Sequence, residues 1–421
     1  MKDPATAAPE GELRRAGWII AASYFALGLA DPNAGLWQLP LQWLLKERLS
    51  LGAEEIAVFF ATALLPWYFK PLAGLLSDAL PLFGSRRRAY LLAGAGGAAL
   101  ASLAVAFAPV EKLWLLTCII TIHAALMLVS TVTGGLLVEA GQRWSATGRL
   151  TSWRSLAEST AALCAGPVGG WLAGTQLGLP AGLSVGLALS IFATFAINLR
   201  NEVPVVCVPR NARSVLLAPV TALLCSRGVW VAAALLCCYQ VAPGFQTPLF
   251  FLQTDTLRFT PRFLGTLAFV SAVGSLAGAA AYAWCCRRIP FRQLFPAAIF
   301  VGVATTMTYL RYGSARAAVV IEACNGIAAA FAFVALLDLI ARAMPKGQEA
   351  LGYAFVFSVG NLASSASDIV GSRWFDAGVP FSQLVWVNAG TTALLLIAVP
   401  FIPQRLVERG EDSLNPHREP P

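Results

Sequence analysis

The stretch PWYFKPLAGLLSDALPLFGSRRRAYLL, residues 66–92, decides the fold. Its apolar first part reaches Asp78, a short turn follows, and the three arginines at 86–88 stand just before the next apolar segment. An apolar segment that ends in a basic loop is typical of a polytopic membrane protein, because short cytoplasmic loops carry an excess of Lys and Arg. We therefore expect further membrane spans on both sides of this stretch.

The composition excludes an ordinary soluble protein. Of the 421 residues, 57% are hydrophobic and 12% are charged, whereas about 25% of the residues in a soluble domain are charged. A helix of about 20 apolar residues can cross the bilayer core, and the chain contains twelve such segments. The expected spans are residues 18–45, 55–77, 90–108, 114–137, 150–171, 179–199, 229–252, 263–284, 291–310, 317–340, 350–370 and 384–402.

The positive charge follows membrane topology. The formal net charge is +8, but 20 of the 30 Lys and Arg residues fall on one side of the expected spans and 8 on the other, while Lys70 and Arg154 lie inside spans. This bias predicts that both termini are cytoplasmic. We therefore expect a multi-pass protein of the bacterial inner membrane whose macromolecular partner is the lipid bilayer and not a nucleic acid.

The domain organisation is expected to be two halves of six helices. Residues 1–200 form the first half, 201–213 a cytoplasmic linker, 214–402 the second half and 403–421 a polar cytoplasmic tail. Residues 39–57 align with 247–265 at a constant offset of 208, so that Pro40 meets Pro248. Such internal repeats are common in secondary transporters.

The loop after the second span resembles a motif of the major facilitator superfamily. Gly74, Asp78, Gly84, Arg86 and Arg88 carry its order of a glycine, an acid and a basic cluster. We interpret these five residues as a gating motif, in which the glycine permits close helix packing and the acid pairs with a basic residue. The alternative is a basic loop that only sets topology.

Three segments together resemble the folate-biopterin transporter family of that superfamily. They are residues 66–92, the stretch MPKGQEALGYAFVFSVGNLASSASDIVGS at 344–372 and, more weakly, FLGTLAFVSAVGSLAG at 263–278. The resemblance implies an all-α polytopic membrane protein with twelve transmembrane helices in two six-helix halves, the major facilitator fold. It further implies a secondary transporter for a small folate- or pterin-like solute, with proton symport as a mode of coupling, and we expect a monomer.

Charged side chains inside a span are costly, by roughly 2.5–3.5 kcal/mol at a helix centre, so each is a candidate functional residue. Lys70 follows Trp67 and Tyr68, where a cation could attract a carboxylate and a ring could stack on a flat heterocycle. Alternatively, Lys70 extends to the cytoplasmic interface. Arg154 and Glu158 lie four residues apart and are expected to form an ion pair, as a coupling device or as a static structural pair.

Other candidates lie at expected helix breaks or on helices that line the cavity in the resembled superfamily. Asp31 adjoins Pro32 and Gly35, and interrupted helices at the midplane commonly line substrate sites. The expected substrate-binding residues are Asp31, Gln38, Trp67, Lys70, Arg154, Gln240, Glu322, Asn325 and Asn361. The expected proton-coupling residues are Asp31, Glu158 and Glu322.

No apparatus for catalysis or metal binding is visible in the sequence. The nine Cys and two His residues form no metal-ligand pattern, and we expect no metal, no cofactor and no enzymatic activity. His123 is either a hydrogen-bonded packing residue or a group that titrates near neutral pH. Two other functions stay open: a permease for another organic anion or a muropeptide-like solute, and a transporter-like sensor or integral membrane enzyme.

Overall fold

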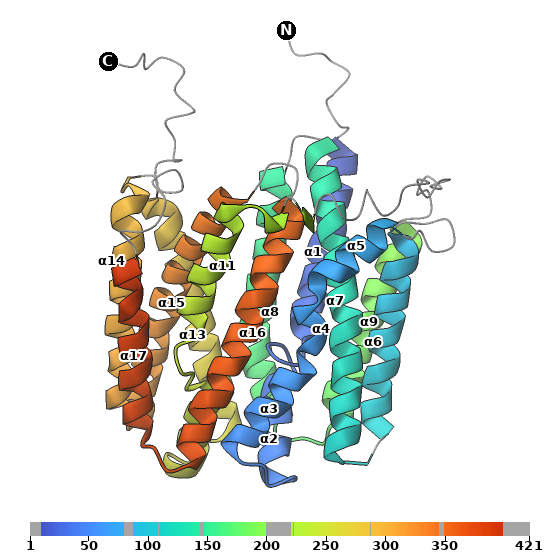
Figure 1. Ribbon diagram of the computed structural model, residues 1–421. Coiled ribbons are helices and arrows are strands. Elements are labelled where there is room, and N and C mark those ends of the chain that lie inside the picture. Colours follow the sequence, from blue (N-terminus) through green and yellow to red (C-terminus); the bar gives the residue numbers. More distant parts are fainter. Residues whose placement is uncertain are drawn as a thin grey trace, which may run out of the picture. The chain divides into compact units, whose positions relative to one another are not determined.

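The computed structural model describes residues 10–79, 87–107, 109–143, 147–198, 220–221, 223–286, 288–344 and 349–398, and all their regular secondary structure is helical (Figure 1). The N-terminal helices are α1 (Glu10–Ala30), α2 (Gln38–Glu47), α3 (Ala53–Ala63), α4 (Leu65–Tyr68), α5 (Lys70–Ala79), α6 (Arg88–Phe107), α7 (Lys112–Arg143), α8 (Thr147–Leu172) and α9 (Gly178–Asn198). The later helices are α11 (Arg227–Gln240), α12 (Gln246–Phe251), α13 (Pro261–Cys285), α14 (Phe291–Thr306), α15 (Ala315–Ala343), α16 (Glu349–Asp376) and α17 (Phe381–Ala398). A π-helical turn, Leu252–Thr256, and a 3₁₀ turn, Met307–Arg311, extend α12 and α14.

These elements account for the twelve expected spans, because several spans consist of more than one helix. Helices α1 and α2 form one span, α3 to α5 the next, and α11 with α12 a third. Among the described residues, six helices are long and apolar enough to cross a membrane by composition alone, namely α6, α7, α9, α13, α14 and α15.

The first span breaks where its sequence predicts. The backbone N–H of Asn33 donates to Asp31 Oδ1 at 2.8 Å, which closes a local turn after α1. A Cβ on Gly35 would meet the carbonyl oxygen of Gly28 at 2.7 Å, so this turn requires glycine. Pro40 lies inside α2 and does not interrupt it. The span that begins the second half breaks at the equivalent place, between Gln240 and Gln246.

The second span, expected as one helix, consists of three short helices. Pro66 and Pro71 are the second residues of α4 and α5. Proline has no N–H to donate to the preceding turn, and its ring clashes with the carbonyl four residues back. The consequence is a joint immediately before each proline-containing segment, and Lys70 stands at the second joint.

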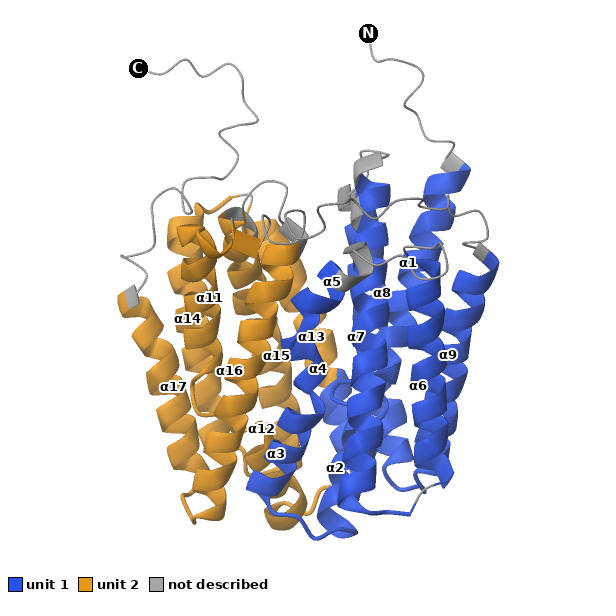
Figure 2. Ribbon diagram, turned by 45° about the vertical axis from the view of Figure 1, so that its right-hand side comes forward, with its two compact units in different colours: residues 1–219, 260–269 blue, residues 220–259, 270–421 orange. Residues whose placement is uncertain are grey.

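The chain divides into two compact units, coloured separately in Figure 2. Unit 1 comprises Met1–Pro219 with Thr260–Phe269, and unit 2 comprises Val220–Phe259 with Val270–Pro421. In unit 1, α6 packs on α7 and α9, and α1 packs on α8 around a small apolar core that includes Leu29, Ala161 and Leu172. In unit 2, α11, α14, α15 and α16 enclose a larger apolar core.

Candidate functional site

Lys70 is held inside unit 1 by a hydroxyl and an aromatic ring. Its Nζ donates to Ser130 Oγ of α7 at 3.2 Å and lies 5.0 Å from the centre of the Trp67 ring. A cation over an indole face gains about 0.5–2 kcal/mol, depending on its desolvation. Among the residues that the structure describes, Lys70 forms no ion pair.

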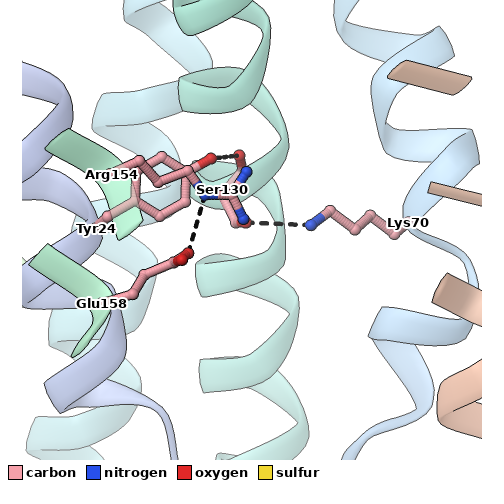
Figure 3. A network of polar contacts seen from close by, with 5 residues as sticks. All are labelled: Tyr24, Lys70, Ser130, Arg154 and Glu158. Atoms are coloured by element: carbon pink, nitrogen blue, oxygen red, sulfur yellow. Dashed lines mark hydrogen bonds and ion pairs between the residues drawn. The ribbon is translucent and has the colours of Figure 1, made fainter. Parts of the chain in front are cut away.

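Arg154 of α8 lies on the other side of Ser130 (Figure 3). Its guanidinium carbon is 4.3 Å from the centre of the Tyr24 ring, and its Nε is 3.0 Å from Glu158 Oε1, the expected ion pair. The hydroxyl of Tyr24 donates to the backbone carbonyl of Ser130 at 3.4 Å. Ser130 therefore connects the two cations, with its side chain on Lys70 and its backbone on the tyrosine under Arg154.

His123 joins this network to the break in the first span. Trp67 Nε1 donates to His123 Nδ1 at 2.9 Å, and His123 Nε2 is 3.2 Å from Asn33 Oδ1. Because an indole nitrogen only donates, Nδ1 must accept, and the imidazole proton lies on Nε2, where it can bond Asn33. His123 is fully buried and is a hydrogen-bonded packing residue in this structure. Asp31 is linked to it through the Asn33 turn.

Glu322 lies in unit 2 at the centre of a tyrosine pair. Tyr312 OH donates to Glu322 Oε1 at 3.1 Å, and Tyr309 OH lies 3.5 Å from Oε2. Gln253 Nε2 donates to the Tyr312 oxygen at 2.7 Å. The two phenol rings stack with centres 5.5 Å apart. Both phenol hydroxyls lie at this carboxylate, so a change in the charge of Glu322 would alter its hydrogen bonds with both tyrosines.

Gln240 and Asn325 line a cavity of about 220 Å³ in unit 2, between α11, α12, α14, α15, α16 and α17. Gln246, across the break from Gln240, lines it as well. Asn325 is one turn from Glu322 on α15 but does not contact the tyrosine pair. Its Nδ2 donates to the Thr305 carbonyl at 3.1 Å. Glu322 is not among the residues that line the cavity.

Gln38 and Asn361 are not brought into either network. Gln38 is exposed at the start of α2, and Asn361 lies in α16 with no hydrogen-bond partner among the described residues. The hydroxyl of Ser358, one turn before Asn361 on α16, donates to the carbonyl of Ala354 in the same helix at 2.8 Å.

Only part of the expected gating motif lies within the described residues. Gly84 and Arg86 fall outside them, as does the side chain of Asp78. Gly74 faces Thr131, whose methyl carbon would be 3.5 Å from an added Cβ, and Arg88 Nη2 donates to the Ala196 carbonyl at 3.4 Å.

Arg87, which lies between Arg86 and Arg88 of the expected motif, forms an ion pair in this region. Arg87 Nη2 is 2.5 Å from Glu139 Oε1 of α7. Gly135 makes room for the guanidinium, because a Cβ there would lie 2.7 Å from Arg87 Nη1.

Sequence reasoning missed several residues that hold these sites. Ser130, Tyr24 and Asn33 are ordinary polar residues of apolar spans, and nothing in the sequence pairs them with distant charges. Asp368 is different, because it is an acid inside an expected span and lines the cavity of unit 2. The rule that singled out Lys70 could have found it.

Comparisons with known proteins identify the family. A model of the BT1 family matches residues 32–403. The chain belongs to the BT1 family. A folate-biopterin transporter from Synechocystis sp. is 27% identical over 411 residues, which cover 91% of this chain and 80% of that protein. A folate transporter from Plasmodium falciparum is 24% identical over 378 residues, which cover 81% of this chain and 77% of that protein. The family expected from the sequence motifs is confirmed.

Solved structures confirm the fold. A D-xylose-proton symporter superposes with a TM-score of 0.65 at 15% identity, covering 94% of this chain and 98% of its own. The nucleoside transporter NupG gives a TM-score of 0.65 at 12% identity, covering 92% and 98%. The expected all-α architecture of the major facilitator type is therefore confirmed, and the protein is an integral multi-pass membrane protein.

Proposed function

We propose that this protein is a secondary transporter that moves a folate- or pterin-like solute across the membrane by alternating access. The observation that carries the proposal is Lys70, a cation inside a spanning segment without an ion-pair partner among the described residues. Folates carry carboxylates and a flat ring, and Lys70 with Trp67 offers a charge and an aromatic surface for such groups. The names of the relatives in the BT1 family support the same solute class.

Arg154 supplies a second cation, already paired. The side chains of Arg154 and Glu158 keep 39% and 42% of their exposure, so a solute carboxylate can reach the pair and compete with Glu158 for the guanidinium. Asp31, through the Asn33 turn and His123, holds the broken first span against Trp67. Solute binding at Lys70 would then be felt at the helix break.

Proton coupling is assigned in this proposal to Glu322, with Asp31 and Glu158 as further exchangeable carboxylates. Protonation of Glu322 removes the charge that Tyr309 and Tyr312 contact and frees the 3₁₀ turn, which carries Tyr309 and is followed directly by Tyr312. In proteoliposomes, E322Q should still exchange labelled solute but should lose accumulation driven by an imposed proton gradient. Equal accumulation by E322Q and the unchanged protein would contradict the role of Glu322.

The remaining expectations complete the proposal. Gly74, Asp78, Gly84, Arg86 and Arg88 act as the gating motif. Residues 1–200 and 214–402 rock against each other about the linker 201–213 while both termini, including the tail 403–421, stay cytoplasmic.

The protein works as a monomer in the bacterial inner membrane, and Gln38 and Asn361 contact the solute in conformations other than the one described. Protease accessibility of terminal tags in spheroplasts and inverted vesicles tests the topology.

Uptake of labelled folate and biopterin by a transport-deficient bacterial host tests the function. K70Q removes the ammonium and should weaken folate uptake by about 10- to 150-fold, the equivalent of one charge-assisted hydrogen bond of roughly 1.5–3 kcal/mol. K112Q is the matched control, because Lys112 pairs with Glu55 at 3.1 Å in an exposed position outside the network. It should transport like the unchanged protein.

Each outcome of this assay decides between solute classes. No folate or pterin accumulation above empty vector, with membrane expression verified, would refute the solute class. A thermal-shift panel of other organic anions and muropeptide-like solutes would then separate the competing permease function from a sensor, since a ligand of the folded state stabilises it. Equal uptake by K70Q and K112Q would refute the role of Lys70 alone.

A further inference from the structure

The cavity of unit 2 contains one acid and no base among the described residues that line it. Asp368 of α16 is the acid, and the remaining polar lining consists of amide and hydroxyl side chains. The carboxylate is fixed by Thr247 at the start of α12, whose hydroxyl donates to Oδ2 at 2.6 Å and whose backbone N–H donates to Oδ1 at 3.2 Å. A carboxylate has about four acceptor positions, so two remain for a ligand.

Three of the polar side chains on this wall already use their donors within the protein. Asn388 Nδ2 donates to the carbonyls of Pro243 and Ala242 at 3.0 and 3.4 Å. Asn325 Nδ2 donates to the Thr305 and Ile321 carbonyls and to Thr308 Oγ1. Ser367 Oγ donates to the Ala242 carbonyl. What these side chains still present to the cavity is oxygen, so the wall is complementary to a ligand edge that carries N–H or O–H groups.

Gln240 and Gln246 complete the lining in a different way. Neither side-chain amide has a hydrogen-bond partner among the described residues, so each can donate as well as accept. A ligand that combines adjacent N–H donors with a carbonyl acceptor could satisfy both Asp368 and these amides.

The size and the aromatic lining favour an organic ring over a bare ion. The cavity has a volume of about 220 Å³, whereas a single water needs only about 10–15 Å³ on the same measure. Tyr239 and Phe245 line the space, and Phe245 is kept in place by edge contacts with Tyr309 and Phe381, ring centres 5.1 and 5.7 Å away. A flat heterocycle would find a fixed aromatic surface there.

We propose that this cavity binds a flat heteroaromatic ring through a pair of adjacent N–H groups, which donate to the carboxylate of Asp368. The 2-amino-4-oxo edge of a pterin has these groups, with a carbonyl for Gln240 or Gln246. The inference rests on the proposed function and deepens it, because it names a residue of unit 2, Asp368, that recognises the N–H edge of the heterocycle.

Binding of ring and tail as separate molecules tests the assignment. The full chain in detergent is titrated with biopterin, which has the pterin ring without the p-aminobenzoylglutamate part of folate, and with p-aminobenzoylglutamate, which has that part without the ring. D368N should weaken biopterin binding by about 10- to 100-fold, as expected for the loss of charge-assisted hydrogen bonds, and should leave the tail compound unchanged. K70Q should show the reverse pattern.

Two matched variants separate recognition from structure. T247V removes the hydroxyl that holds Asp368 but keeps the charge, so it should weaken biopterin binding far less than D368N. D338N removes another acid of unit 2, which does not line the cavity and accepts a hydrogen bond of 2.8 Å from Tyr282 OH. This variant should bind biopterin normally. If D368N does not yield folded protein, Q240L provides the second test at the opposite polar group, with a selective loss of biopterin binding expected.

The failure of this inference is distinct from that of the proposed function. Unchanged protein that binds neither compound nor folate refutes both. Unchanged protein that binds biopterin, with D368N equal to it or T247V as weak as D368N, refutes the ring site alone. Stabilisation by sodium over potassium without any pterin, lost in D368N, would make the cavity a cation site and also overturn the proposal.

Discussion

Substitution of Gly371 by alanine should destabilise unit 2 from the inside. Gly371 of α16 packs against the break between α11 and α12, and an added Cβ would lie 2.8 Å from the carbonyl carbon of Gly244 and even nearer its oxygen. Carbon atoms in contact stay about 3.5–4.0 Å apart, so one backbone must move by about 0.7 Å or more. Overpacking of this kind costs roughly 1–3 kcal/mol. The displaced segment carries Thr247, which anchors Asp368 at 2.6 Å.

Gly186→Ala should have the opposite effect on the stability of the folded protein. Gly186 lies inside α9 with nothing within 4 Å of an added Cβ, and alanine in a helix interior is favoured over glycine by up to about 1 kcal/mol. The apparent unfolding temperature of purified protein in detergent should therefore fall for G371A and hold or rise for G186A. A G371A protein as stable as G186A, with normal biopterin binding, would refute the close approach of the Gly244 segment to α16.

Three further outcomes follow from the contacts of unit 1. His123→Ala leaves Trp67 Nε1 and Asn33 Oδ1 without their shared partner at a cost of roughly 1–3 kcal/mol each, so both the unfolding temperature and uptake should fall; a silent substitution would contradict the buried bridge. R154M should destabilise more than R154M combined with E158Q, because the single change leaves a carboxylate unpaired, while neither variant transports; additive effects in this double-mutant cycle would count against the ion pair. R87Q breaks the ion pair with Glu139 on the loop after the second span and should lower the maximal uptake rate with little change in KM, and a change in KM alone would place Arg87 at the solute instead.

The helix breaks were largely readable from the sequence. Pro32 with Gly35, and Pro243 with Gly244, predict interruptions near residues 31–37 and 241–245, and both are present. The two joints in the second span were missed, although Pro66 and Pro71 lie there, because an intrahelical proline can bend a membrane helix without ending it. Whether a proline ends a helix or only bends it thus depends on whether neighbouring helices satisfy the freed carbonyls. The local sequence does not show this.

The candidate site was only partly readable. Charges inside spans are conspicuous, so Lys70, Arg154, Glu158 and Glu322 could be nominated from the sequence, and the spacing of Arg154 and Glu158 predicted their pair. Their partners could not be predicted, because helices that are apolar on nearly every side carry no pattern that tells which face meets which neighbour. Ser130 belongs to the site because the face of α7 that carries it is turned toward Lys70, and the sequence does not show which face that is.

The three-part second span also affects how the chain enters the membrane. Lys70, Arg154 and Asp368 all lie in helices that fall outside the six whose composition alone suffices for spanning. The apparatus that inserts nascent chains selects segments by hydrophobicity, so α5 and α8 should be poor substrates for it when presented singly. Each is followed by a strongly apolar helix, α6 or α9, that can retain it. A polar site in this protein therefore depends on its neighbours during synthesis, before any solute is met.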